Sequence, residues 1–448
     1  MDAQQAGVRP APDPNPVSAA IFERAKRVMP SGYTRDLVAV KPHPQYAVSG
    51  DGCWITDVDG NRVMDWVNNF TALIHGHNKR EIVEVIASQA GHLMSAMLPT
   101  EWEVQLAELL CERIPGVESV RFMNSGTEAN QVVTKIARAY TGKPKIAKME
   151  GGYHGQYDLL EASFQPRPPA WGEARRPQAV AHNPGTPQSL LDELVVLPLN
   201  DVDATREILR ERAHELAAVI LDPFRLQLGM VEPELPYLQM LRDETAKLGI
   251  LLVFDEVMCL RVGYHGAQGM LGVTPDLTTM GKIIGGGLPI GGVGGSARVM
   301  AVFEMDRGDN RVKHSGTYTA NPMSMAAGYV GMTLLTREVF ARLDAQGSRL
   351  REGLEAIRRD LGIEGYVAGK ASMSALMLTP NVVRNYRQLA AAVGGGMVDR
   401  MNVAQKLMLD EQLLTMRSGF IGSTPMTDDD LEFTLTGVRR AYARMKSL

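Results

Sequence analysis

The sequence predicts an α/β protein in two parts, a large domain built on a mostly parallel sheet and a smaller α+β domain after it. Two observations carry this prediction. From about residue 80 to residue 320, short apolar runs alternate with segments of helical periodicity, which favours parallel strands covered by helices on both faces. After Met323 the pattern changes to longer helical segments and mixed short elements. At 448 residues, with 45% hydrophobic content, the chain is long enough to form two such domains.

Each element of the predicted large domain follows from its own periodicity. Helices are predicted where apolar residues recur three and four positions apart, over Glu81 to Met94, Val104 to Arg113 and Glu128 to Tyr140. Strands are predicted at short, largely apolar runs: Ser119 to Phe122, Lys145 to Lys148, Leu194 to Leu197, Ala217 to Leu221 and Ile250 to Phe254. Beyond Met323, helical spacing predicts helices over Met325 to Leu335 and Glu338 to Arg359.

The segment ahead of the large domain has the alternation of short strands. Tyr46 to Val48 and Cys53 to Thr56, closed by the turn Asp57 to Asn61, predict a small antiparallel unit. We therefore divide the chain into an N-terminal segment that contributes to the small domain (residues 1–75), a ligand-binding large domain (76–323) and a C-terminal small domain (324–448).

Composition excludes several classes of function. The net charge is only −4, so no strong field favours nucleic acid or an anionic membrane as a partner. The apolar runs are too short to span a bilayer, and the N-terminus lacks the basic start and apolar core of a signal peptide. The three cysteines show no metal-ligand spacing and their odd number argues against a disulfide framework, so no metal site is expected. We expect a cytoplasmic protein.

Lys282 and Asp255 are the most informative pair for chemistry. Lys282 closes the small-residue turn Thr278 to Gly281, and Asp255 ends the apolar run Ile250 to Phe254. A lysine that can form a Schiff base and an aspartate that keeps a pyridine nitrogen protonated are what pyridoxal 5'-phosphate (PLP) chemistry requires. Taken singly, Lys282 could be a surface lysine, and Asp255 could be a helix cap or a magnesium ligand.

Two further segments could hold such a cofactor. Ser125, Gly126 and Thr127 stand at a predicted helix start, where free backbone N–H groups attract a phosphate, although an ordinary helix cap explains them equally. Tyr153 follows Gly151 and Gly152, and its flat face could stack on an aromatic ring, although a core tyrosine in a turn is common.

Read together, these motifs resemble one known family. Their order resembles the class III aminotransferases of PLP fold type I, and the block from Arg261 to Gly295 is most similar to the branch of glutamate-1-semialdehyde aminomutase and its β-amino-acid aminotransferase relatives. The segments that carry the likeness are Asn124 to Ala129, Gly152 to Gly155, Phe254 to Val257 and Pro275 to Lys282. The resemblance covers roughly residues 20 to 445 and implies a seven-stranded sheet in the large domain.

The resemblance also implies roles for individual residues. Lys282 would form the Schiff base and shuttle a proton, Asp255 would pair with the pyridine nitrogen, and Tyr153 would stack on the ring. The remaining cofactor-binding positions are Ser125, Gly126 and Thr127 as a phosphate cup, with His154 and Val257 beside them. Thr317 would reach the phosphate from the neighbouring subunit, so a homodimer with shared active sites is implied.

Three arginines depart from the aminomutase pattern and bear on the substrate. Arg225 stands in Asp222 to Arg225, where the family usually has Glu-Pro, an apolar residue and Gln or Ala. Arg417 replaces an acidic residue ahead of a Gly-Phe pair, and Arg35 matches a loop arginine of the aromatic β-amino-acid aminotransferases. A guanidinium suits bidentate carboxylate binding, while each could equally be a solvated or locally paired arginine. The segment Phe164 to Pro187 is longer than the aminomutase lid and could form a pocket wall.

The expected function is a PLP-dependent aminotransferase. It would move an amino group between a carboxylate-bearing amine, a β-amino or aryl amino acid, and a keto acid, with ping-pong kinetics through pyridoxamine phosphate. The alternative is a 2,1-aminomutase of the glutamate-1-semialdehyde type. A third reading, a binding protein of this fold without turnover, conflicts with the presence of both Lys282 and Asp255.

Overall fold

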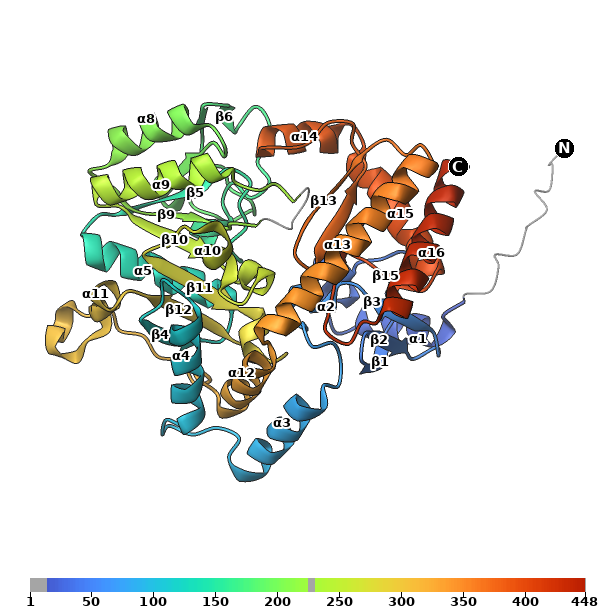
Figure 1. Ribbon diagram of the computed structural model, residues 1–448. Helices are drawn as coiled ribbons and strands as arrows, with labels where there is room; N and C mark the ends of the chain where they lie inside the picture. The colour runs from blue at the N-terminus through green and yellow to red at the C-terminus, as the bar shows by residue number, and fades with distance from the viewer. Residues whose placement is uncertain (1–13, 225–229, 448) are drawn as a thin grey trace.

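A seven-stranded mixed sheet forms the centre of the larger part of the molecule (Figure 1). The computed structural model describes residues 14–224 and 230–447. Six strands run parallel and β12 runs antiparallel to both of its neighbours. In spatial order the strands are β4 (Ser119–Met123), β12 (Gly291–Gly295), β11 (Leu277–Gly281), β10 (Leu251–Asp255), β9 (Leu216–Leu221), β5 (Lys145–Met149) and β8 (Leu194–Leu197). The predicted α/β class is confirmed, and each of the five predicted strands ends within one residue of its expected bounds.

Strands β11 and β12 were not predicted as strands. Residues 278–281 belong to β11 and are not a turn, and β12 is built almost wholly of glycine, a residue that is depleted in strands. Glycine is required in β12 because other backbone lies against it. A Cβ on Gly291 would stand 2.0 Å from the carbonyl oxygen of Ser125. Such close approach of two backbones is a tertiary property that periodicity does not reveal.

Helices cover both faces of this sheet, and the strand side chains alternate between them. Leu251 and Val253 of β10 belong to the cluster that packs on α5 (Gly126–Thr141). Leu252 and Phe254 pack in the opposite cluster, which contains side chains of α8 (Val202–Arg212) and α9 (Leu235–Leu248). The alternation places Asp255, the last residue of β10, on the side of α5.

Further helices complete this part of the fold. The helix α12 (Pro322–Leu334) packs against α3 (Arg80–His92) and α4 (Glu101–Arg113). Shorter helices are α6 (Asp158–Glu161), α7 (Gln188–Leu191), α10 (Gly266–Leu271) and α11 (Ala297–Met300), and a two-stranded hairpin is formed by β6 (Gly172–Glu173) and β7 (Arg176–Pro177). No helix in the described part of the chain combines the length and apolarity needed to cross a membrane.

The rest of the chain forms two small sheets with their helices. One sheet joins both ends of the chain: β1 (Ala47–Asp51), β2 (Trp54–Asp57) and β3 (Arg62–Asp65) are antiparallel, and β15 (Leu413–Leu414) pairs parallel to β3. The other contains β13 (Tyr366–Lys370), β14 (Met373–Met377) and β16 (Gly419–Ile421). The helices here are α1 (Pro16–Ala25), α13 (Arg337–Asp360), α14 (Tyr386–Gly394), α15 (Met397–Asp410) and α16 (Asp428–Lys446) (Figure 1). The domain boundaries after residues 75 and 323 stay predictions.

Candidate active site

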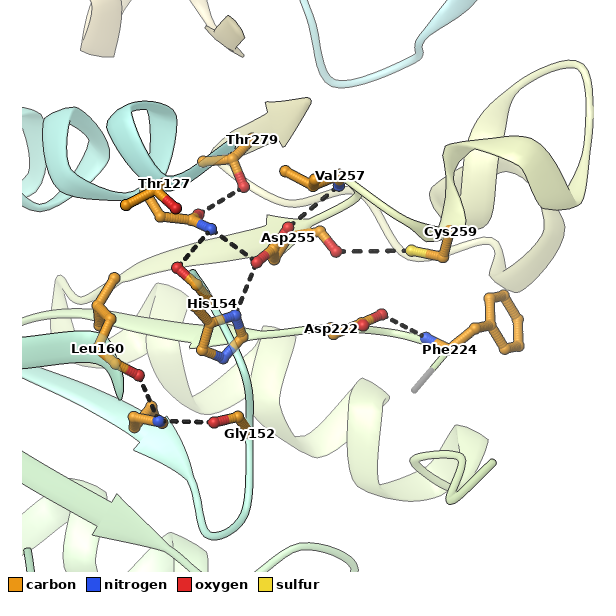
Figure 2. A network of polar contacts seen from close by, with 12 residues as sticks. Thr127, Gly152, His154, Leu160, Asp222, Phe224, Asp255, Val257, Cys259 and Thr279 are labelled. Atoms are coloured by element: carbon orange, nitrogen blue, oxygen red, sulfur yellow. Dashed lines mark hydrogen bonds and ion pairs between the residues drawn. The ribbon is translucent and has the colours of Figure 1, made fainter. Parts of the chain in front are cut away.

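Asp255 lies at the centre of the candidate site, at the carboxyl end of β10. Its Oδ2 accepts a hydrogen bond from Nδ2 of Asn130 over 2.8 Å and lies 2.8 Å from Nδ1 of His154, while Oδ1 accepts from the backbone N–H of Val257 at 3.1 Å (Figure 2). Asp255 and His154 are both buried. The carboxyl ends of strands are where open α/β sheets bind ligands. The side chain of Asp255 is therefore held in one orientation by three neighbours.

Asn130 contacts Asp255, and it is not among the candidate site residues named from the sequence. Besides Asp255, its Nδ2 donates to the carbonyl oxygen of His154 at 3.1 Å, and its Oδ1 accepts from Oγ1 of Thr279 at 2.8 Å. All its polar atoms are thus engaged inside the protein, where the side chain is 2% exposed. One signal could have found it: a polar residue on the otherwise apolar face of an amphipathic helix points toward the sheet.

Lys282 follows immediately after β11, the strand beside β10. Parallel pairing places Asp255 opposite Thr279, three residues before the lysine. Asp255 and Lys282 therefore lie at the same edge of the sheet although 27 positions separate them in the chain. Burial lowers the pKa of Lys282 to about 8, against smaller opposing effects of the Asp222 and Asp255 carboxylates. Within the described residues its ammonium has no hydrogen-bond or ion-pair partner. Lys282 also has φ of +52°, a left-handed conformation that non-glycine residues rarely adopt.

The segment 125–127 forms the N-terminus of α5. The hydroxyl oxygen of Ser125 accepts from the N–H of Glu128 at 3.1 Å, so it caps the helix, as the alternative interpretation expected. The cap leaves the first N–H groups of the helix, at Gly126 and Thr127, without an intrahelical acceptor. Cap and anion site are therefore compatible.

Glycines keep this helix end open to close neighbours. A Cβ on Gly126 would lie 2.7 Å from a methyl group of Val257, and one on Gly155 would lie 2.4 Å from Oγ1 of Thr127. Gly155 also has φ of +86°, which favours glycine. The structure thus brings Val257, Thr127 and the Gly155 turn together at one end of α5.

Tyr153 lies on the loop that follows β5. It is half-buried, its ring centroid is 4.9 Å from that of Phe164, and burial raises the pKa of its hydroxyl, with the nearby Glu161 and Asp255 carboxyls adding to the effect. The loop is fixed from beneath by the fully buried Lys148. Its ammonium donates to the carbonyl oxygens of Gly152, at 2.7 Å, and Leu160 (Figure 2). It also donates to the carbonyl oxygen of Ala162 at 2.7 Å.

Glu256, the second acid of the Asp255-Glu256 pair, has a structural position. It accepts from the N–H groups of Ala267 and Gln268 at 2.6 and 3.2 Å and from Nε2 of Gln268 at 2.9 Å. Burial raises the pKa of Glu256 to about 7. Adjacent strand residues point to opposite faces, so only Asp255 faces α5.

The remaining predicted residues lie in less enclosed positions. Thr317 is exposed in the single chain. Arg35 is also exposed, and its Nη1 donates to Oδ1 of Asn69 at 3.1 Å. Arg417 is half-buried with φ of +59°, burial lowers its pKa, and its guanidinium has no partner among residues 14–224 and 230–447. Arg225 lies outside the described residues.

The donor set fits PLP. Asp255 could offer a carboxyl group to a ring nitrogen, Lys282 an amine without a partner in the described chain to an aldehyde, and the glycine-lined start of α5 its N–H groups to a phosphate. These three needs are met by residues from β10, the end of β11 and α5, which the sheet order places side by side.

Comparison with known proteins places this chain in a family. The chain is 37% identical over 438 residues to a protein of Halalkalibacterium halodurans named glutamate-1-semialdehyde 2,1-aminomutase 2, covering 96% of this chain and 98% of the relative. The structure of an omega-transaminase from Sphaerobacter thermophilus superposes with a TM-score of 0.93 at 43% identity, covering 96% of this chain and 98% of the other. A β-phenylalanine aminotransferase from Variovorax paradoxus superposes with a TM-score of 0.86 at 33% identity, covering 97% and 96%. The family model described as aminotransferase class-III matches residues 38–414. This protein belongs to the class III aminotransferase family, whose enzymes depend on PLP and have fold type I.

Proposed function

We propose that this enzyme is an aminotransferase that moves an amino group between a carboxylate-bearing amine, a β-amino or aryl amino acid, and a keto acid, in a ping-pong sequence. The observation that carries the substrate class is Arg417. A half-buried guanidinium without a partner in the described chain is an arrangement that a substrate carboxylate would complete. The similarity to a β-phenylalanine aminotransferase at 33% identity over 97% of the chain supports the same class.

The chain's own residues have distinct roles in this proposal. PLP, when bound, supplies an aldehyde that reacts with amines and a ring that takes up electrons. Lys282, neutral above about pH 8, accepts the proton from the carbon next to the substrate nitrogen and returns it. Asp255, oriented by Asn130 and His154, holds the ring nitrogen protonated. Tyr153 stacks on the ring.

The phosphate and the substrate carboxylate would be bound by separate positive sites. Ser125, Gly126 and Thr127 present N–H groups and the positive end of the α5 dipole to the phosphate. In this proposal Arg417 binds the substrate carboxylate. Arg35, from the N-terminal part of the chain, would bind the same carboxylate, although in this structure it donates a hydrogen bond to Asn69. Arg225 stays a third candidate.

We further propose a cytoplasmic homodimer with Thr317 completing the partner's phosphate site. Its support is an exposed apolar surface: the side chains of Met97, Leu98 and Tyr318 are 104%, 77% and 62% exposed. A cavity of about 770 Å³ lies beside them, lined by residues of α4 and β4 together with His314 to Gly316 and Thr319. A second copy of the chain would cover these exposed apolar side chains. The three cysteines are free in the structure.

A 2,1-aminomutase is the second candidate. Its support is the 37% identity to a protein named glutamate-1-semialdehyde 2,1-aminomutase over 96% of this chain. Arg417 is a base where the aminomutase pattern has an acid. Its positive charge would repel the positively charged amino groups of a diamino compound, which an aminomutase must bind, so Arg417 favours the aminotransferase.

Separate half-reactions distinguish the two. The PLP form is mixed with a panel of β-amino, aryl and α-amino acids and loss of its visible absorbance is followed; the product form is then mixed with keto acids. The proposal expects amino acids to convert the first form and keto acids to restore it. Reaction with one amino-aldehyde alone, and with no keto acid, would establish the aminomutase.

A further inference from the structure

The loop that carries Tyr153 continues into a proline-rich segment that contacts the helix α14. After β5 the chain passes through Tyr153, then α6, then Phe164, and reaches the hairpin β6–β7. Figure 1 shows α14, from the C-terminal part of the chain, lying between this region and β13. The first two residues of α14, Tyr386 and Arg387, contact the segment at several points.

Tyr386 packs against the start of the Tyr153 loop. A Cβ on Gly151 would lie 2.1 Å from the Tyr386 ring, so the ring fills the space of a missing side chain. The Tyr386 hydroxyl donates to the carbonyl oxygen of Pro166 at 2.9 Å, and its ring lies edge-on to Trp171 with centroids 6.2 Å apart. Tyr386 is thereby fixed to both ends of the segment.

Arg387 makes the stronger contacts. Its Nε donates to Oε2 of the buried Glu150 at 2.9 Å and its Nη2 lies 2.8 Å from Oε1. Its Nη groups also donate to the carbonyl oxygens of Trp171, Gly172 and Glu173 at 2.9, 3.0 and 3.4 Å. The guanidinium lies 3.9 Å from the centroid of the Trp171 ring. One planar cation thus binds a carboxylate and three carbonyls, which a lysine could not reproduce.

The contacts of Arg387 restrain the chain on both sides of Tyr153. Glu150 stands three residues before Tyr153 in the chain, and Phe164, whose ring packs on Tyr153 at 4.9 Å, precedes the fastened hairpin. We propose that Arg387 is a positioning residue, which fixes the Tyr153 loop and its aromatic neighbour Phe164 from the C-terminal part of the chain. The proposal rests on the proposed stacking role of Tyr153. Arg387 also links the C-terminal part of the chain, which carries Arg417, to the loop that carries Tyr153.

The first test measures how firmly the segment is held, in apoenzyme, and does not depend on any role of Tyr153. Trypsin can cut between Arg175 and Arg176, whose side chains are each 56% exposed, while the proline after Arg176 protects the next bond. In Arg387→Met we expect trypsin to cut this bond at least about tenfold faster, because charged hydrogen bonds no longer oppose local opening of the segment. Peptide mass spectrometry measures the cleavage rate. Arg384→Met is the control, since the side chain of that exposed arginine pairs with Glu234 at 2.9 Å and with no other acid among the described residues. Equal rates in both variants would overturn the proposal.

The second test reports on Tyr153 itself. The visible circular dichroism of the bound cofactor depends on the groups that surround its ring. We expect Arg387→Met to weaken this band toward that of Tyr153→Ala, with Arg384→Met unchanged and Arg387→Lys in between. A Tyr153→Ala band equal to wild type would refute the stacking role alone. A Tyr153→Ala change that Arg387→Met does not share, with the far-ultraviolet spectrum intact, would refute the positioning role.

Discussion

Asn130 donates a hydrogen bond to Asp255 over 2.8 Å, although 125 positions separate them in the chain. The same amide nitrogen donates to the carbonyl oxygen of His154, and the amide oxygen accepts from Thr279. One side chain of α5 thereby ties together β10, β11 and the loop after β5. A helix residue, together with His154 and the Val257 N–H, therefore orients the carboxyl group that would face a ring nitrogen.

Loss of Asn130 should weaken cofactor binding more than folding. Asn130→Ala removes a hydrogen bond to Asp255, a contact worth about 1.5–3 kcal/mol when one partner is charged, so PLP should dissociate about tenfold more readily. Titration of apoenzyme with PLP, followed by absorbance, measures this. Gln131→Ala on the same helix is the control and should bind like wild type. Equal affinities for the two variants would show that Asn130 does not support the site.

Replacement of Lys282 should remove transfer and leave the fold intact. Lys282→Ala lacks the amine that we propose holds the cofactor and moves the proton, and we expect turnover to fall by about three orders of magnitude or more. Borohydride reduction of the wild-type holoenzyme followed by peptide mapping should place the label on Lys282. A label elsewhere, or wild-type turnover in the variant, would contradict the assignment.

The titration of Lys282 gives a prediction with a definite sign. Because burial lowers its pKa from 10.5 to about 8, modification of the apoenzyme amine by an amine-directed reagent should rise through about pH 8. The Asp222 carboxylate raises this pKa, so Asp222→Asn should move the midpoint lower. Between about pH 8 and 10.5 the unfolded chain holds the proton and the folded one does not, so this group's contribution to stability becomes more favourable as pH rises. A midpoint that rises in Asp222→Asn would contradict this assignment of charges.

Gly155 and Gly60 have nearly equal φ angles, so comparing them separates the cost of a left-handed conformation from the cost of steric contact. Gly155 has φ of +86° and faces Thr127 at 2.4 Å, whereas Gly60 has φ of +87° and open space around its Cβ position within the described chain. Gly60→Ala should cost about 1–2 kcal/mol of unfolding free energy, from the left-handed conformation alone. Gly155→Ala should cost more and also weaken PLP binding, because it displaces Thr127. Thermal unfolding and PLP titration of both variants measure the difference, and equal losses would argue against a cup at Thr127.

The substrate arginines can be compared by the carboxylate dependence of KM. Arg417→Ala should raise KM for a β-amino acid by about tenfold to a hundredfold, since a charged hydrogen bond of about 1.5–3 kcal/mol is lost, and should leave KM for an amine without a carboxylate nearly unchanged. Arg35→Ala is tested beside it, because Arg35 already donates to Asn69. An equal rise for both amines in Arg417→Ala would mean that the arginine supports the fold instead.

The sequence alone determined the α/β class, five strands of the large sheet and the candidate chemistry, because these depend on local periodicity and on motifs that are contiguous in the chain. It was wrong about residues 278–281, which form β11, because a strand of small residues buried on both faces lacks an apolar run. It also gave no sign that glycines could form β12, since their role is to admit the backbone of Ser125.

Only the tertiary structure brought distant groups together. Parallel pairing of β10 and β11 set Asp255 beside the end that carries Lys282, and α5 supplied Asn130. The same holds for Arg387, which lies 237 positions from Glu150 and looks like any solvated arginine in the sequence. Hydrogen bonds and burial depend on packing across the chain, and a linear pattern records only its local part. The proposed role of Lys282 could therefore be predicted from the sequence and stays a prediction, whereas its pKa, its neighbours and the contacts of the Tyr153 loop are set by the fold.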